Sequence, residues 1–182
     1  MWSFYKALIK GFRSTGAMAP SSHYLAAAMA HALPKKLDGI VIELGPGTGA
    51  ITKGLLARDI PRDRIIAVES SEEFFKHMQQ EFPEVQTILG NAENLSELLA
   101  HIKFPVTAIV SSLPLRILPA TTQENIMREI DKVLTINGYY IQYTYALKKN
   151  PLFHSERYQK LYSHKVWFNL PPARVDVFKK IT

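Results

Sequence analysis

Residues 40–49 read IVIELGPGTG, an apolar strand that runs into an acidic residue and three alternate glycines. Glycine at Gly45, Gly47 and Gly49 lets the backbone turn tightly and approach a ligand without a clash at Cβ. The next residues, AITKGLLA from Ala50, open a helix whose free N-terminal amides face the same place. This strand, turn and helix predict an α/β fold that binds a nucleotide-type cofactor at the end of its first strand.

Two cofactors compete for this turn. Gly45, Gly47 and Ala50 satisfy the Gly-x-Gly-x-x-Gly/Ala fingerprint of dinucleotide sites, and Glu69 follows at the end of a second strand. An acid there accepts hydrogen bonds from ribose hydroxyls in either cofactor. Glu43 separates the two, because its carboxylate would repel the pyrophosphate of NAD and attract the ammonium and sulfonium of S-adenosylmethionine. The sequence therefore favours S-adenosylmethionine.

The Glu-x-Gly-x-Gly-x-Gly run resembles motif I of class I S-adenosylmethionine-dependent methyltransferases. The resemblance implies a Rossmann-like fold that holds the cofactor at the glycine turn and at the ends of neighbouring strands. The predicted cofactor-binding residues are Glu43, Leu44, Gly45, Pro46, Gly47, Thr48, Gly49, Glu69, Ser70, Asn91, Ala92 and Ser111. Because Asn91 stands where the family usually has aspartate, we expect it to bind adenine N6 through its carbonyl oxygen, and more weakly.

The rest of the chain alternates strand-length apolar runs with amphipathic segments, the pattern of a mostly parallel sheet. The predicted strands are 40–44, 64–69, 85–89, 106–111 and 139–145, and the predicted helices are 48–58, 71–82, 94–102 and 120–134. Residues 165–169 and 174–178 flank a Leu-Pro-Pro connection that is too short for a crossover helix, so these strands must pair antiparallel. We expect a mostly parallel seven-stranded sheet with a C-terminal antiparallel hairpin, the methyltransferase form of the doubly wound fold.

Length and composition limit the other possibilities. We expect 182 residues to form a single methyltransferase domain, 1–182. The chain has no cysteine and no apolar run of about 20 residues, and its N-terminus lacks a secretory pattern, so the cytoplasm is the expected compartment. The net charge of +6 indicates a polyanionic partner, RNA or an anionic membrane surface, or serves solubility alone.

Residues 1–34 are predicted to form an N-terminal helical extension. Within 1–18 an apolar stripe is flanked by basic residues; the stripe is Trp2, Tyr5, Leu8, Ile9 and Phe12, and the flank is Lys6, Lys10 and Arg13. Such a helix either lies in a membrane interface or packs on the domain's own sheet. Ser21 or Ser22 is expected to cap a second helix that ends near Leu33.

A second motif, SSLPLRILP at residues 111–119, follows the fourth strand at the carboxyl edge of the sheet, where α/β proteins hold the reacting part of a ligand. Amine and adenine N-methyltransferases carry Asn/Asp-x-Pro-aromatic here, and its side chain and carbonyl accept hydrogen bonds from the target nitrogen. The corresponding residues are Ser112, Leu113, Pro114 and Leu115. The missing aromatic counts against RNA adenine as the substrate.

This motif, Gln142-Tyr-Thr-Tyr145, the tail VWFNLPPARV at 166–175 and GAMAPSS at 16–22 together resemble the bacterial phospholipid N-methyltransferases. The resemblance covers nearly the whole chain. It implies a peripheral enzyme at the inner face of the cytoplasmic membrane, which methylates the phosphatidylethanolamine nitrogen towards phosphatidylcholine. The implied partners are an anionic membrane surface and phosphatidylethanolamine; RNA is less favoured, and no protein partner is inferred.

Methyl transfer from a sulfonium is an in-line displacement, so the protein has mainly to position donor and nucleophile, and we expect no metal. The predicted catalytic residues are Ser112, Leu113 and Pro114, with Tyr24, His23 and Tyr143 as candidates to accept the amine proton. Tyr143, Tyr145 and Trp167 are candidates for cation–π contact with a methylated headgroup, or are ordinary packing residues. The basic, aromatic stretch 148–165 is either a lid over phosphate headgroups or a solvated helix.

Two rival functions stay open. The first is a relative of the rRNA adenine N6-dimethyltransferases, which share motif I and would grip RNA phosphates with a basic surface. Those enzymes usually carry a helical C-terminal domain, which we do not expect in this chain. The second is a cofactor-binding membrane adapter without catalysis.

Overall fold

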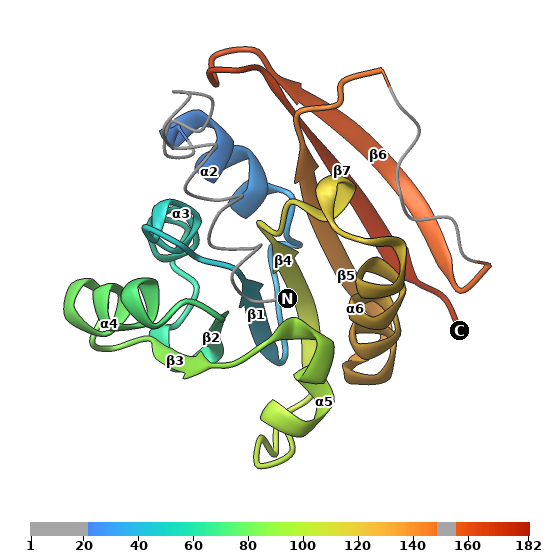
Figure 1. Cartoon of the computed structure of the whole chain (residues 1–182). Coiled ribbons are helices and arrows are strands. Elements are labelled where there is room, and N and C mark those ends of the chain that lie inside the picture. The colour runs from blue at the N-terminus through green and yellow to red at the C-terminus, as the bar shows by residue number, and fades with distance from the viewer. Residues whose placement is uncertain (1–21, 149–155) are drawn as a thin grey trace.

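The computed structural model of the chain describes residues 22–148 and 156–182. Within them lies a seven-stranded sheet in the order β3-β2-β1-β4-β5-β7-β6 (Figure 1). The strands are β1 (Ile40–Leu44), β2 (Ile65–Glu69), β3 (Gln86–Leu89), β4 (Val106–Ser111), β5 (Leu134–Thr144), β6 (Tyr158–Val166) and β7 (Ala173–Lys180). Strands β1 to β5 pair in parallel, and β7 is antiparallel to both of its neighbours. The predicted mostly parallel sheet with a C-terminal hairpin is confirmed.

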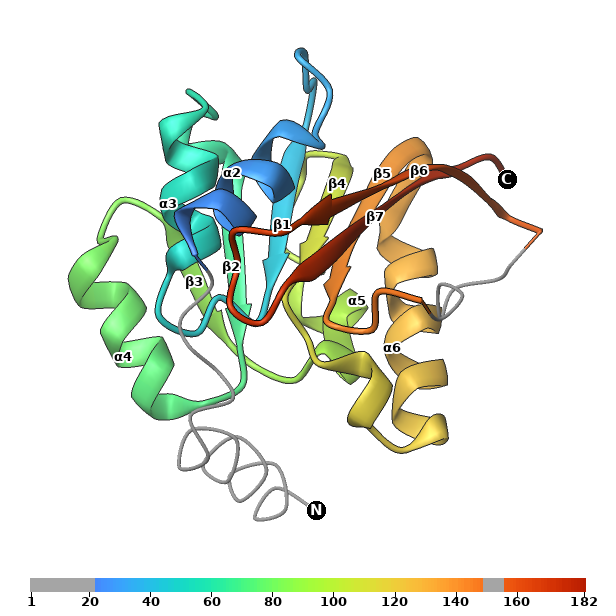
Figure 2. The ribbon, with the colours of Figure 1, turned by 90° about the horizontal axis from the view of Figure 1, so that it is seen from above.

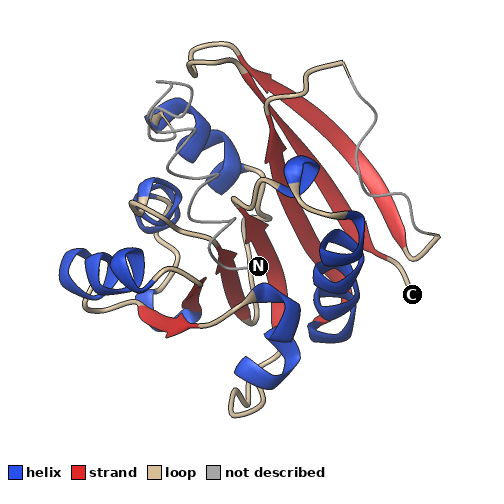
Figure 3. Cartoon of the chain, in the orientation of Figure 1, coloured by secondary structure: helices blue, strands red, loops and turns tan. Residues whose placement is uncertain are grey.

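Helices cover both faces of this sheet (Figures 2 and 3). They are α2 (His23–His31), α3 (Ala50–Ala57), α4 (Glu72–Glu81), α5 (Leu95–Leu98) and α6 (Ala120–Val133), with short 3-10 turns η1 (Arg62–Arg64), η2 (Ala92–Asn94) and η3 (Leu115–Ile117). Apolar side chains of α2, α3 and α4 fill one core layer, and those of α5 and α6 fill the other. The predicted helix 94–102 is shorter than expected, because regular helix ends at Leu98.

The N-terminal predictions are met in part. Ser22 is the N-cap of α2, since its hydroxyl accepts a hydrogen bond from the Leu25 amide at 3.2 Å. The helix ends at His31, two residues before the predicted Leu33. The amphipathic helix predicted over 1–18 lies outside the described residues.

The C-terminal hairpin is longer than predicted and begins earlier. Strand β6 ends at Val166, so the prediction of a strand over 165–169 is wrong, and residues 158–165 form a strand and not the predicted solvated helix. The alternative, a lid over phosphate headgroups, stays a prediction. Only the two ends of β6 are buried, because it is the edge strand and pairs with β7 alone. Its side chains therefore lack the alternation of apolar and polar residues that marks a half-buried strand.

The strand order reverses between β1 and β4, and open α/β sheets bind ligands in the crevice outside such a switch point. The turns that follow these two strands touch there. The Ser112 amide donates a hydrogen bond to the Leu44 carbonyl at 2.9 Å. A Cβ at Gly45 would lie 2.9 Å from the Leu113 side chain. The fold thus places the glycine turn directly beside the second motif.

Candidate active site

The three glycines of the turn have different neighbours. Gly45, Gly47 and Gly49 all have positive φ, at +69°, +57° and +76°, a backbone conformation that residues other than glycine rarely adopt. A Cβ at Gly45 would meet Leu113, and one at Gly49 would meet the Phe82 ring at 2.2 Å. A Cβ at Gly47 would meet nothing within 4 Å. Gly47 is therefore the point at which a ligand can approach the backbone.

Glu43 is the most unusual charged group of the site, because β1 buries it completely. The Thr52 hydroxyl donates to its Oε2 at 2.7 Å, whereas Oε1 has no hydrogen-bond partner among the described residues. Burial raises the pKa of the Glu43 carboxyl to about 7; the Thr52 hydrogen bond acts against this shift, and the negative charge of Glu69 adds to it. A cation at Oε1 would satisfy the carboxylate and favour its charged form.

The carboxylate of Glu69 is held by three backbone N–H groups at the end of β2. Its Oε1 accepts from Ser70 and Ser71 at 2.8 and 2.9 Å, and its Oε2 accepts from Gly47 at 3.1 Å. A carboxylate has about four lone-pair directions, so a ribose hydroxyl can still donate to it. The Gly47 bond also ties the glycine turn to the second strand.

These features fit S-adenosylmethionine. An unpartnered buried carboxylate oxygen suits its ammonium group, the open backbone at Gly47 admits it, and Glu69 suits its ribose.

The remaining predicted residues are placed less directly. Asn91 caps η2, where its side chain accepts from the Glu93 amide and donates to the Glu93 carboxylate. Ser111 is fully buried, and its hydroxyl is 3.4 Å from the Leu113 amide that donates to it.

Most of the other predicted cofactor residues surround the same turn. Leu44 and Pro46 are buried, Thr48 and Ser70 are partly exposed, and Ala92, the first residue of η2, is buried. The side chains of Leu44 and Ser111 are fully buried, and the Leu44 carbonyl already accepts the Ser112 amide. Their roles as cofactor contacts stay predictions.

In the turn after β4, Ser112 and Leu113 differ sharply. The Leu113 carbonyl already accepts two hydrogen bonds, from Gln142 Nε2 at 3.0 Å and from the Leu115 amide at 2.8 Å. The Ser112 hydroxyl oxygen is buried and has no partner in the part of the chain that the structure describes. Of the predicted substrate contacts, the Ser112 hydroxyl is thus the better acceptor for an amine N–H.

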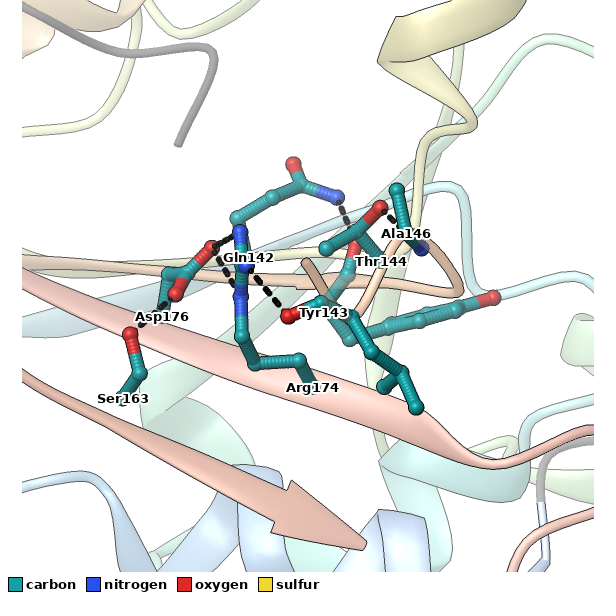
Figure 4. A network of polar contacts seen from close by, with 8 residues as sticks. Gln142, Tyr143, Thr144, Ala146, Ser163, Arg174 and Asp176 are labelled. Carbon is teal, nitrogen blue, oxygen red and sulfur yellow. Dashed lines mark hydrogen bonds and ion pairs between the residues drawn. The ribbon is translucent and has the colours of Figure 1, made fainter. Parts of the chain in front are cut away.

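Gln142 holds this turn in place and was not predicted as a site residue. Its amide donates to the Leu113 and Tyr143 carbonyls, and its oxygen accepts from the Tyr140 hydroxyl at 2.8 Å. Figure 4 shows Gln142 beside a buried pair in which Arg174 donates to Asp176. The sequence marked Gln142 only as part of the Gln142-Tyr-Thr-Tyr145 motif of the family resemblance, without a role for its side chain.

The predicted proton acceptors lie on different elements. Tyr143 is half-buried in β5, and its ring meets Tyr145 edge to face at 5.6 Å. Tyr24 lies in the first turn of α2, where its ring contacts His23 and Phe168. Their catalytic roles stay predictions.

Within residues 22–148 and 156–182, no group of His, Cys, Asp or Glu is arranged to hold a metal ion, and no helix could cross a membrane.

The fold and the site define an S-adenosylmethionine-dependent methyltransferase with a Rossmann-like sheet. Residues 41–138 match the family described as "Methyltransferase domain", and the chain belongs to that family. NAD, the competing cofactor, is thereby set aside.

The chain is similar to several known proteins. An ornithine lipid N-methyltransferase from Singulisphaera acidiphila is 27% identical over 184 residues, which cover 95% of this chain and 94% of the relative. A ribosomal RNA small subunit methyltransferase A from Chromobacterium violaceum is 34% identical over 91 residues, which cover 50% of this chain but 34% of that protein. The crystal structure of Aeropyrum pernix fibrillarin with natively bound S-adenosyl-L-methionine has a TM-score of 0.65 and 18% identity, and the match covers 86% of this chain and 75% of that one.

Replacing Glu43 by glutamine should stabilise the cofactor-free protein and weaken cofactor binding. The pKa of Glu43 is about 7 in the folded protein, raised from 4.5. The protonated Glu43 carboxyl therefore contributes its full stability below about pH 4.5, and this contribution is lost as the pH rises through 7. Glu43→Gln should therefore raise the free energy of unfolding by about 1–3 kcal/mol at pH 8 and by little at pH 4.5. Urea titrations at both pH values test this.

In the same variant, the loss of the carboxylate should weaken S-adenosylmethionine binding by about ten- to a hundredfold, measured by calorimetry at pH 8. Conservative Thr52→Ser keeps the hydroxyl and serves as the control. Unchanged affinity in Glu43→Gln would remove Glu43 from the cofactor site.

Gly47→Leu should abolish cofactor binding and leave the fold intact. Its side chain would enter the open space at Gly47, while the positive φ costs about 1–2 kcal/mol. Asn137→Leu is the matched control, because Asn137 also has positive φ, +67°, and is exposed at the opposite edge of the sheet. Calorimetry should show binding in Asn137→Leu alone; binding retained in Gly47→Leu contradicts the proposed path of the cofactor.

Proposed function

We propose that this protein transfers methyl groups from S-adenosylmethionine to the headgroup amine of a membrane lipid, with phosphatidylethanolamine as the first candidate substrate. The observation that carries the proposal is the extent of the lipid methyltransferase match, which runs over 95% of this chain and 94% of the relative. The match to the ribosomal RNA enzyme covers half of the chain. The match to the lipid methyltransferase therefore extends over the C-terminal hairpin as well as the cofactor turn.

The turn after β4 supports an amine as the acceptor. When bound, S-adenosylmethionine supplies an electrophilic methyl carbon, which an amine lone pair can attack while the bond from this carbon to sulfur breaks. The buried, unpartnered Ser112 hydroxyl can accept an N–H from that amine and orient its lone pair. A buried polar group left unpaired costs about 1–3 kcal/mol, so an amine bound at Ser112 also relieves a cost of the free protein.

The same turn gives little support to an RNA base. Leu115 takes the position at which adenine methyltransferases carry a stacking aromatic ring, and its side chain is buried in the core beside α6. Stacking on an aromatic or guanidinium plane is the usual way in which a protein holds an extruded base. An RNA substrate stays the alternative because the ribosomal RNA relative is 34% identical over half of this chain.

An ethanolamine headgroup is mainly protonated near pH 7, so the protein must also accept a proton. We propose Tyr143 for this step ahead of Tyr24. Gln142 links the Tyr143 carbonyl directly to the turn that carries Ser112, whereas Tyr24 contacts the β6–β7 connection. The compartment proposed with this function is the cytoplasm, at the inner face of the cytoplasmic membrane.

A methyl-transfer assay tests the proposal. Purified protein with methyl-labelled S-adenosylmethionine is offered vesicles that contain phosphatidylethanolamine, vesicles that contain ornithine lipid, and unmethylated small-subunit rRNA. We expect label in phosphatidylethanolamine and none in RNA, and Gly47→Leu should be inactive on all three. Label in ornithine lipid alone would keep the amine-lipid class and reject the named lipid. Label in RNA alone would reject the proposal, and no label at all would favour an adapter.

Ser112 should matter for turnover and not for the cofactor. Ser112→Ala removes one neutral hydrogen bond to the amine, so kcat should fall about three- to tenfold while the dissociation constant of S-adenosylmethionine stays the same. Ser112→Asn restores the acceptor found at this position in other amine methyltransferases and should recover activity. Equal kcat in wild type and Ser112→Ala would show that the hydroxyl does not hold the substrate.

A further inference from the structure

The connection between β6 and β7 exposes large apolar side chains to solvent. In this connection, residues 167–172, the exposed fractions of Trp167, Phe168 and Leu170 are 61%, 79% and 79%. We call it the hairpin tip. Three large apolar residues gathered in one turn mark a contact surface rather than ordinary scatter of apolar residues over a protein surface.

The hairpin tip is held firmly against the rest of the protein. Asn169, between the exposed residues, is buried, and its side-chain oxygen accepts from the Ser22 amide at 2.9 Å. Its amide group donates to the Pro171 carbonyl at 2.7 Å. The ring of Phe168 lies 5.3 Å from that of Tyr24. The turn that carries the exposed side chains is thus fixed beside α2; Figure 1 shows the β6–β7 connection near this helix.

The hairpin tip lies at the edge of the sheet that carries the site. Strands β5 and β6 are both antiparallel to β7, so β6 runs in the same direction as β1 to β5. The end of β6 is therefore at the carboxyl edge, with the glycine turn and Ser112. Two other exposed apolar residues lie at the opposite edge: Phe104 precedes β4, and Ile136 lies near the start of β5.

An exposed cation, Lys165, adjoins the hairpin tip. Its ammonium lies 5.6 Å from the centre of the Trp167 ring. The chain as a whole has a net charge of +6. Tryptophan beside lysine, with a more exposed phenylalanine and leucine, suits a bilayer surface, where aromatic rings and ammonium groups lie among headgroups and aliphatic groups lie deeper.

We propose that Trp167, Phe168 and Leu170 insert into the surface of an anionic bilayer and hold the carboxyl edge of the sheet, with its active site, against the membrane. The proposal rests on the proposed function, because a lipid substrate makes the bilayer the natural occupant of this surface. It places the bilayer at the edge of the sheet where Ser112 lies, since docking surface and site share that edge.

Sedimentation of the full-length protein with vesicles of phosphatidylethanolamine and phosphatidylglycerol tests the docking surface. Phe168→Ser/Leu170→Ser should lower the partition coefficient by about tenfold or more. The matched control Phe104→Ser/Ile136→Ser removes exposed apolar side chains at the opposite edge and should stay within about twofold of wild type. Both variants should melt like wild type and bind S-adenosylmethionine equally well.

Several outcomes would overturn the inference. The first is that the wild-type protein does not bind vesicles. The second is that the tip variant and the control variant lose vesicle binding equally. The third is a tip variant that loses self-association in light scattering but keeps its vesicle binding. Binding that is lost on deletion of residues 1–18 and unaffected by the tip variant would also reject it. A tip-dependent vesicle binder that methylates no lipid would support the surface and reject the proposed function.

A fluorescence measurement gives an independent answer, because the chain has only two tryptophans. In Trp2→Phe, Trp167 is the sole tryptophan. Its emission should shift to the blue on addition of vesicles and be quenched by lipids brominated on the acyl chain. Unchanged emission in a protein that does bind vesicles would show that the hairpin tip stays outside the bilayer.

Discussion

A buried carboxylate with one free oxygen is the constraint on which the site depends. Burial of a carboxylate is unfavourable unless its oxygens find partners, and the fold provides one hydroxyl, Thr52, for the two oxygens of Glu43. The remaining oxygen and the nearby carboxylate of Glu69 place negative charge beside the glycine turn. Negative charge there favours a cationic ligand over a pyrophosphate, which explains why a Rossmann-like turn takes S-adenosylmethionine here.

The switch point of the sheet brings the glycine turn and the turn after β4 together. Hydrogen bonds from Ser112 to Leu44 and from Gln142 to Leu113 lock the turn after β4 between β1 and β5. A displacement of either strand would move the amine acceptor relative to the cofactor. Such rigid positioning is what an in-line displacement requires, since its rate depends on the alignment of nucleophile and leaving group.

Sequence alone predicted the sheet, the glycine turn and the antiparallel hairpin, because strand length, glycine spacing and a short Pro-Pro connection are local signals. The predicted strand at 165–169 was wrong, because an edge strand with solvent on most of its length carries no alternating pattern. The roles of Thr52 and Gln142 could not be predicted either. Both depend on which side chains the tertiary fold brings together: nothing near Thr52 marks it, and the motif that begins at Gln142 does not say what its side chain contacts.

The most direct test of this account is the titration of the Glu43 side-chain carboxyl by carbon-13 NMR, assigned by comparison with Glu43→Gln. Without cofactor we expect a midpoint near pH 7, since burial raises the pKa of this carboxyl. With saturating S-adenosylmethionine the midpoint should fall by about one pH unit or more, because a cation beside the carboxylate favours its charged form. A midpoint near the ordinary value of 4.5 without cofactor, or one that S-adenosylmethionine leaves unchanged, would contradict the account.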